Sequence, residues 1–310
     1  MTAPPATSPA GVRAVTLDAG GLPLSGLLAE PAGGCAPRAV VVALHGAGMS
    51  AGYFDSRARP GLSLLTLGAE LGCTVLALDR PGYGLSARHL PDGQDLAGQT
   101  ATLRAALAGF ARDHATGAGF FLLAHSNGGR LALSAAAGRW ERADVPLIGL
   151  DVSGLGRRFA VDRDRLPSAS GRGDWRRHWG ALRFYPPDAF RLGGALVSPV
   201  PAREAAEMPL WPEMYPGVAA RVRVPVRFTF AEQERWWRHD EEAVRELLAP
   251  LDATRASVAR QPGAGHNISL GWAARTYHLR ALAFLEECLL ARATALPPVP
   301  APVPAVAPGG

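Results

Sequence analysis

Short, nearly continuous apolar runs recur along the chain and restrict its fold more than any other feature. A run with apolar residues at almost every position is typical of a strand buried on both faces. The runs are Arg38–Leu44, Thr74–Leu78, Phe120–Ala124, Leu147–Leu150 and Val224–Phe230. A separate pair, Val12–Leu17 and Leu22–Ala29, flanks Gly20-Gly21 and predicts a hairpin.

Helical patterns lie between the later strands. Leu103, Ala106, Leu107 and Phe110, for example, recur at the three- and four-residue spacing of one helix face. The predicted helices are Leu96–Ala115, Leu131–Ala137, Glu241–Leu248 and Trp272–Ala293. Strands that alternate with helices favour an α/β fold, with a mostly parallel sheet covered on both faces.

One segment, residues 154–221, interrupts this alternation. It is rich in arginine and aromatic residues and too long for an ordinary connection, so we expect short helices that form a cap over the carboxyl ends of the strands. The alternative is a partly disordered surface insertion, favoured by the Gly/Ser/Arg stretch Ser168–Asp174. The expected core is therefore residues 12–153 and 222–293. Residues 1–11 and the Pro/Ala-rich tail 294–310 are expected to be disordered.

Composition excludes several classes of protein. The net charge is +5, but the arginines are scattered among acidic residues, so a nucleic-acid partner is not expected. Cys35, Cys73 and Cys288 are too far apart for a zinc motif or a disulfide framework, which predicts neither metal nor disulfide. The sequence shows neither a secretory signal nor a membrane-spanning run, so we expect a soluble, cytoplasmic protein without a membrane partner. It does not indicate the oligomeric state.

Ser126 lies in the sequence Ala-His-Ser-Asn-Gly, residues 124–128, between an expected strand and an expected helix. A tight turn at this place would lift the serine hydroxyl above the sheet, as a nucleophile requires. Gly128 permits close packing of the strand and the helix. Ala124 stands where the motif more often has glycine, and a methyl group is tolerable there. We therefore predict that Ser126 is a catalytic nucleophile.

A glycine-containing loop, His45-Gly46-Ala47-Gly48, follows the first buried strand. Backbone amides in such a loop can stabilise an oxyanion together with the amide of the residue after the serine. The predicted donors are the amides of Ala47 and Asn127, with Gly48 as the next candidate upstream. His45 and His125 lie within the turns themselves and are expected to be structural.

A serine nucleophile needs a base and an acid that orients it, and in this architecture they follow the serine in the order acid, then histidine. His266, in the glycine-rich Gly263-Ala264-Gly265-His266, is the predicted base, in a loop after a strand-like segment, Thr254–Val258. Glu234, shortly after the strand that ends near Phe230, is the predicted acid. Three other carboxylates stay open as alternatives: Glu232, Asp240 and Asp151.

Together these motifs resemble those of the α/β-hydrolase superfamily, over roughly Val12 to Ala293. The matching pieces are the loop at His45–Gly48, the sharp turn Asp79-Arg80-Pro81-Gly82-Tyr83-Gly84, the turn around Ser126 and the loop before His266. The resemblance implies an eight-stranded sheet, a cap inserted after the sixth strand, and no cofactor. The composition of the Asp79 turn, with two glycines and a proline, itself predicts a structural role. Ser126 argues against the members that use an aspartate nucleophile.

The predicted activity is hydrolysis of an ester, thioester or amide of a small, largely apolar substrate through an acyl-enzyme, as in carboxylesterases and thioesterases (EC 3.1). An acyltransferase or cyclase could use the same Ser-His-Glu triad, and a non-hydrolytic binding protein could retain the fold. The arginines from Arg157 to Arg177 could meet a phosphate or carboxylate on a carrier-bound acyl thioester, or could be solvated surface charge.

Overall fold

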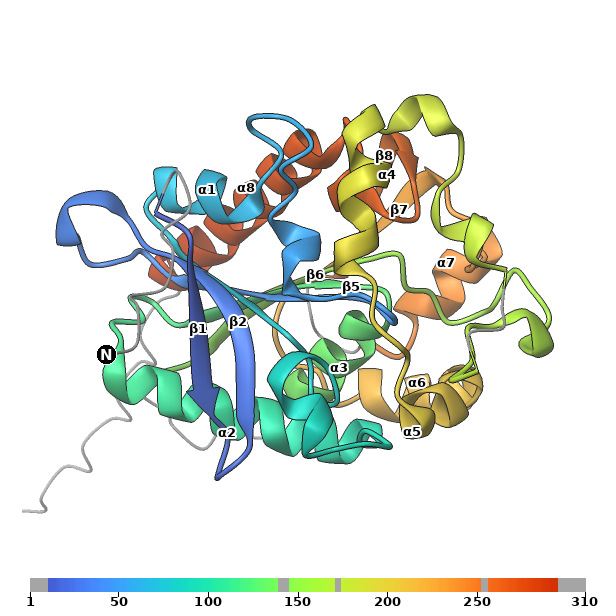
Figure 1. The fold of residues 1–310 in the computed structure, drawn as a ribbon, viewed down its shortest axis with the longest axis horizontal. Coiled ribbons are helices and arrows are strands. Elements are labelled where there is room, and N and C mark those ends of the chain that lie inside the picture. The colour runs from blue at the N-terminus through green and yellow to red at the C-terminus, as the bar shows by residue number, and fades with distance from the viewer. Residues whose placement is uncertain (1–10, 139–144, 171–173, 252–255, 295–310) are drawn as a thin grey trace, which may run out of the picture.

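A computed structural model describes residues 11–138, 145–170, 174–251 and 256–294. Its centre is a single sheet of eight strands, most of them parallel, which confirms the predicted fold class (Figure 1). The strands are β1 (Arg13–Asp18), β2 (Pro23–Ala29), β3 (Val40–Leu44), β4 (Thr74–Leu78), β5 (Phe120–His125), β6 (Leu147–Ser153), β7 (Val226–Gln233) and β8 (Ala256–Gly265). They lie in the order β1-β2-β4-β3-β5-β6-β7-β8. The predicted hairpin, β1 with β2, is antiparallel, as is the β2–β4 pair, and the remaining pairs are parallel.

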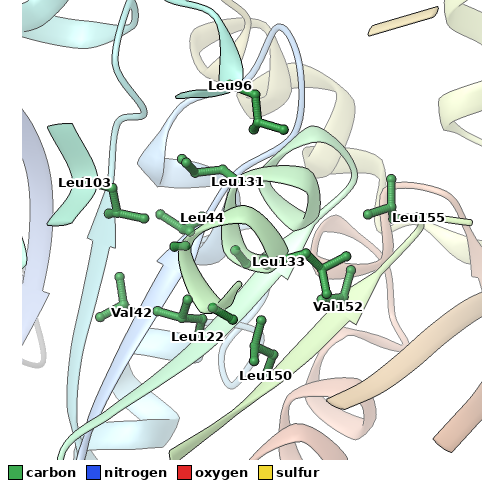
Figure 2. Packing of buried hydrophobic residues seen from close by; sticks show 14 of the residues in the cluster. Val42, Leu44, Leu96, Leu103, Leu122, Leu131, Leu133, Leu150, Val152 and Leu155 are labelled. Carbon is green, nitrogen blue, oxygen red and sulfur yellow. The ribbon is translucent and has the colours of Figure 1, made fainter. Parts of the chain in front are cut away.

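Both faces of the sheet are covered by helices, which explains the continuous apolar runs. In β3, Val40, Val42 and Leu44 pack into one core cluster, whereas Val41 and Ala43 pack into the other. The first cluster lies under α2 (Leu96–Asp113), α3 (Asn127–Ala136) and α7 (Glu241–Leu248). The second lies under α1 (Leu64–Glu70) and α8 (Ala274–Ala293). Figure 2 shows the first cluster, where leucines and valines from β3, β5 and β6 surround the leucines of α3.

Several boundaries differ from the sequence-based prediction, two of them by at least four residues, and one helix was not predicted. Helix α3 begins at Asn127, four residues before the predicted start. Its first turn contains two glycines, which allow the helix to approach the sheet closely. Strand β8 continues to Gly265, so the predicted glycine-rich loop before His266 is largely the irregular end of a strand. Helix α1 was not predicted. It begins at the cap Ser63, whose side chain accepts a hydrogen bond from the Thr66 amide.

Segment 154–221 follows β6 and contains short helices, including α4 (Pro187–Gly193), α5 (Ala202–Glu207) and α6 (Trp211–Ala219). It lies beside the ends of the central strands, in yellow-green to yellow in Figure 1. Trp211 and Tyr215 of α6 are fully buried in the core. The Trp211 indole donates to the Gly156 carbonyl, and the Tyr215 hydroxyl donates to the Leu247 carbonyl of α7. This part of the segment is therefore packed against the core.

The predicted disordered ends, residues 1–11 and 294–310, lie almost wholly outside the described residues, and so do Gly171–Gly173 of the Gly/Ser/Arg stretch. Within the described residues, no helix combines the length and apolar character needed to cross a bilayer.

Candidate active site

Ser126 lies between β5 and α3 in a strained backbone conformation, with φ 52° and ψ −121°. It is the one non-glycine residue with positive φ among the described residues. Such a conformation costs about 1–3 kcal/mol and persists only where the surroundings hold it. Here the Ser126 amide donates to the Ser153 carbonyl of β6 at 2.8 Å. The sharp turn that the sequence predicted around Ser126 is therefore present in the structure.

Two glycines make room for this turn. A Cβ on Gly128 would lie 2.2 Å from the Leu44 carbonyl oxygen, so only glycine lets α3 approach the end of β3 so closely. A Cβ on Gly46 would lie 3.1 Å from the Ser126 Cβ. The loop after β3 and the turn at Ser126 consequently lie against each other, which places the upstream backbone amides near the serine.

His266 and Glu234 form a buried pair. The His266 Nδ1 lies 2.8 Å from Glu234 Oε2, and His266 is only 1% exposed. The second carboxylate oxygen, Oε1, accepts the Trp236 amide at 2.9 Å. Both oxygens of Glu234 are therefore engaged, which fixes the carboxylate against one nitrogen of the imidazole and leaves Nε2 for other partners.

The alternative acids contact other groups. Glu232 accepts the Gly263 amide at 2.7 Å. Asp240 caps α7 and pairs with Arg238, both on the exposed surface. Asp151 lies within β6, where it accepts hydrogen bonds from the Arg227 guanidinium and the Tyr277 hydroxyl. Of the four carboxylates that the sequence left open, only Glu234 contacts His266.

His266 packs beside the turn that holds Ser126. Its ring centre lies 4.6 Å from that of His125, the residue before the serine. Gly154, at the end of β6, lies between these two rings: a Cβ there would be 2.8 Å from His266 Cε1 and 3.0 Å from His125 Cε1. Among the described residues, no hydrogen bond joins the Ser126 hydroxyl to His266. In enzymes without bound substrate, such bonds are often long and tighten only in the complex.

The candidate oxyanion donors differ in their hydrogen bonding. Asn127 is the first residue of α3, so its amide has no acceptor within the helix. The Gly48 amide already donates to the Tyr83 hydroxyl at 3.2 Å, whereas the Ala47 amide has no recorded acceptor among the described residues. This difference favours Ala47 over Gly48 as the upstream donor.

The two histidines expected to be structural are engaged elsewhere. His45 contacts the Gly46 carbonyl through Nδ1, and its Nε2 accepts the Arg80 amide. Burial, with the nearby Arg80 charge, lowers the pKa of His45 to about 3. His125 stacks on Tyr53 and contacts the Ser153 hydroxyl, and burial lowers the pKa of His125 well below its ordinary value.

The sequence-based prediction did not include a buried ion pair that lies beside the candidate oxyanion site. Glu204 of α5 accepts two hydrogen bonds from the Arg80 guanidinium, at 2.8 and 2.9 Å, and is 2% exposed. It also accepts from the Tyr83 hydroxyl at 3.1 Å and from the Asn127 side-chain amide at 2.9 Å. Arg80 in turn donates to the His45 carbonyl. Nothing in the sequence around Glu204, a glutamate in an alanine-rich segment, indicated this contact.

A cavity of about 640 Å³ lies between segment 154–221 and the loop after β3. Its lining includes apolar side chains and backbone from Met49, Trp179, Val197, Pro199 and Val200. Its polar lining includes His178 and Asn267, the residue after His266, so it adjoins the candidate site. Within the described part of the chain, no three His, Cys, Asp or Glu side chains gather in a group that could hold a metal ion.

Comparisons with known proteins agree with the fold. Residues 41–278 match the model of a family described as the alpha/beta hydrolase family. Among solved structures, a soluble variant of monoglyceride lipase from Saccharomyces cerevisiae is 15% identical over 93% of this chain and 96% of its own, with a TM-score of 0.62. The monoacylglycerol lipase of Paleococcus ferrophilus is 19% identical over 86% and 99%, with a TM-score of 0.59. An E-2-(acetamidomethylene)succinate hydrolase is 16% identical over 89% and 99%, with a TM-score of 0.61. A search of curated proteins found no match.

Proposed function

Because the chain belongs to the alpha/beta hydrolase family, we propose that it is a serine hydrolase that cleaves an ester, thioester or amide through an acyl-enzyme. One observation carries the proposal. A buried His266–Glu234 pair lies beside a serine held in a strained turn, which is the arrangement that a serine nucleophile needs.

In the proposed mechanism, the Ser126 hydroxyl attacks the substrate carbonyl while His266 Nε2 takes its proton. Glu234 holds Nδ1, so it fixes the tautomer with Nε2 free and stabilises the imidazolium that forms. The Asn127 and Ala47 amides stabilise the oxyanion of the tetrahedral intermediate. His266 then returns the proton to the leaving group, and water releases the acyl group in a second cycle of the same steps.

We further propose that segment 154–221 acts as a cap and that the cavity beneath it receives a small, largely apolar part of the substrate. A volume of about 640 Å³ lies within the range typical of small-molecule sites, and much of the lining is apolar. Two of the similar structures are monoacylglycerol lipases, which is in keeping with an ester substrate. At 15–19% identity these structures support only the shared fold. Hydrolysis assays with ester, thioester and amide substrates therefore decide among the three bond types.

Labelling with a fluorophosphonate tests the nucleophile directly. The wild-type protein should be labelled at Ser126, and Ser126→Ala should lose labelling and about 10⁶-fold in kcat on an activated ester. A folded wild-type protein that takes no label would refute the mechanism.

A matched pair of substitutions tests the acid. Glu234→Gln should lower kcat by about 10⁴-fold because glutamine cannot stabilise the imidazolium and can favour the wrong tautomer. Glu232→Gln, two residues away, should leave kcat nearly unchanged because Glu232 hydrogen-bonds, within the described part of the chain, to the Gly263 amide and not to His266. Equal losses in the two variants would show that the acid lies elsewhere.

A further inference from the structure

The guanidinium of Arg80 is buried, with an exposure of 1%, and it is bonded to the loop that follows β3. Its Nε donates to the His45 carbonyl at 2.7 Å, and its Nη2 donates to the Gly46 carbonyl at 3.2 Å. Its remaining bonds reach Gln99 and Glu204. Burial of two charges is costly even when they are paired, and a packed apolar pair is often as stable. Stability alone therefore does not account for this arrangement.

The Gly46 carbonyl belongs to the same peptide unit as the Ala47 amide, the proposed upstream oxyanion donor. In a trans peptide the C=O and N–H bonds point in opposite directions, and no peptide bond among the described residues is cis. A donor that holds the Gly46 carbonyl therefore turns the Ala47 N–H away from Arg80. Gly46 itself lies against the serine, since a Cβ there would be 3.1 Å from the Ser126 Cβ. Arg80 thus fixes the orientation of a peptide that lies beside the proposed nucleophile.

Two donors converge on the Gly46 carbonyl. His45 Nε2 accepts the Arg80 amide at 3.0 Å, so the ring proton is on Nδ1, which donates to the Gly46 carbonyl at 2.8 Å. The guanidinium adds a second bond, from a charged donor. Linked hydrogen bonds polarise one another, so donors at the carbonyl make the N–H at the other end of the peptide a stronger donor. The Ala47 amide is thereby prepared for a negatively charged oxygen.

Glu204 of α5 connects this arrangement to the second proposed oxyanion donor. Its carboxylate accepts hydrogen bonds from both terminal nitrogens of Arg80 and, at 2.9 Å, from the side-chain amide of Asn127. The Tyr83 hydroxyl donates to the same carboxylate at 3.1 Å and accepts the Gly48 amide at 3.2 Å, which ties the loop after β3 at a further place. One buried carboxylate of the proposed cap therefore holds both backbone stretches that carry the proposed oxyanion donors.

We propose that Arg80 and Glu204 are positioning residues for the oxyanion site. Arg80 orients and polarises the peptide that supplies the Ala47 amide, and Glu204 holds Arg80 in place. Glu204 also holds Asn127, which supplies the second amide. This inference rests on the proposed serine hydrolase function and gives the proposed cap a part in stabilising the transition state. The gain arises only when the oxyanion forms, so loss of the arrangement should lower kcat and leave KM nearly unchanged.

Two variants remove the arrangement without leaving an unpaired buried charge. Arg80→Lys keeps a positive charge opposite Glu204, but its single ammonium cannot span the carboxylate and the two carbonyls that the guanidinium fork reaches. Arg80→Met/Glu204→Leu replaces both charges by apolar side chains. On p-nitrophenyl butyrate, an activated ester, each variant should lose about 10²-fold in kcat with little change in KM. Affinity for an alkyl trifluoromethyl ketone, whose serine adduct places an oxyanion at this site, should fall by the same factor as kcat/KM.

A second ion pair between the same two helices supplies the matched control, Arg130→Met/Glu207→Leu. Glu207 lies one turn after Glu204 on α5, and Arg130 lies one turn after Asn127 on α3, with 3.3 Å between Arg130 Nη2 and Glu207 Oε2. Among the described residues, no hydrogen bond joins this pair to the loop after β3. The control should therefore retain kcat and affinity for the ketone. Equal losses in the control would overturn the proposal, because they would show that any loosening of this contact lowers the rate.

Wild-type kcat and wild-type affinity for the ketone in folded Arg80→Lys and Arg80→Met/Glu204→Leu would also overturn the proposal. If circular dichroism shows that the double variant does not fold, Arg80→Lys decides alone. The pH dependence of kcat/KM is a further readout, and its midpoint should not move because the His266–Glu234 pair is untouched. A shifted midpoint would place the damage at the proposed base and contradict a role confined to the oxyanion site.

Fluorophosphonate labelling separates this proposal from the proposed function. Ser126 should still be labelled in both variants after long incubation, because the nucleophile and its base remain. If the wild-type protein is labelled and active and the variants match it in kcat and ketone affinity, the positioning role alone is wrong. If the wild-type protein is neither labelled nor active, the serine hydrolase mechanism fails, and this proposal fails with it.

Discussion

Replacing Glu204 by glutamine should destabilise the fold severely. Glu204 neutralises Arg80, and both side chains are almost fully buried, with exposures of 2% and 1%. Burial by itself raises the pKa of Glu204, but the adjacent Arg80 charge and its hydrogen bonds outweigh that effect and hold the pKa below its usual value. The carboxylate is therefore ionised at neutral pH, and glutamine would leave the Arg80 charge unpaired in the protein interior.

The size of this effect follows from the burial of both partners. Removing one member of a buried ion pair typically costs about 3–5 kcal/mol, because the remaining charge can neither return to water nor find a new partner. A domain of this kind has a total stability of about 5–15 kcal/mol, so Glu204→Gln would remove a large part of it. In the double variant Arg80→Met/Glu204→Leu, the loss of unfolding free energy should be about 1–3 kcal/mol smaller than the sum of the losses in the two single variants.

Urea unfolding followed by circular dichroism measures these free energies through the shift in midpoint at constant slope. Glu213→Gln is a matched control in the same segment, since Glu213 pairs with Arg163 on the exposed surface, and its midpoint should barely move. Additive losses in the Arg80–Glu204 cycle, or a Glu204→Gln midpoint equal to that of the control, would refute the reasoning.

Two further perturbations test the surroundings of the site. Gly154→Ala would place a Cβ 2.8 Å from His266 Cε1 in a backbone with φ of 59°, so it should displace the proposed base and lower kcat/KM by about 10²-fold; wild-type kinetics in this variant would contradict the placement. Burial lowers the pKa of His45 and of His278 from 6.5 to about 3. Because the unfolded chain takes up these protons first, stability should be full above about pH 6.5 and fall by ~1.4 kcal/mol per pH unit for each histidine as the pH drops toward 3. His278→Phe should make this slope shallower by about that amount in urea unfolding at a series of pH values, and an unchanged slope would exclude His278 as a contributor.

Much of the sheet could be predicted because burial on both faces leaves a direct mark on sequence. The run Thr74–Leu78 is a strand with those same bounds, and every one of its residues is buried. Helix α1 escaped prediction because its seven residues include Gly68, and glycine is disfavoured inside a helix. The end of β8 escaped because Pro262 and Gly263 normally mark a turn, whereas here an irregular register with β7 continues the strand to Gly265.

The proposed site likewise has parts that the sequence could predict and parts that it could not. The motifs around Ser126 and His266 are local, since each consists of a strand end and neighbouring small residues, so the sequence could indicate them. The choice among four carboxylates depends on which side chain reaches the imidazole, and that contact, between Glu234 and His266, is a property of the folded chain. Glu204 has no local pattern at all, because its role is defined by a partner 124 residues away.

Both key residues of the proposed mechanism are followed in the chain by an asparagine that contacts segment 154–221. Asn127, after the serine, donates through its side chain to Glu204. Asn267, after the histidine, donates through its backbone to the His178 carbonyl. A displacement of this segment would therefore act at two places at once: on the helix start that supplies a proposed oxyanion donor, and on the turn that follows the proposed base. If the segment opens to admit substrate, its return would restore both contacts, so closure and assembly of the reactive geometry would be one event.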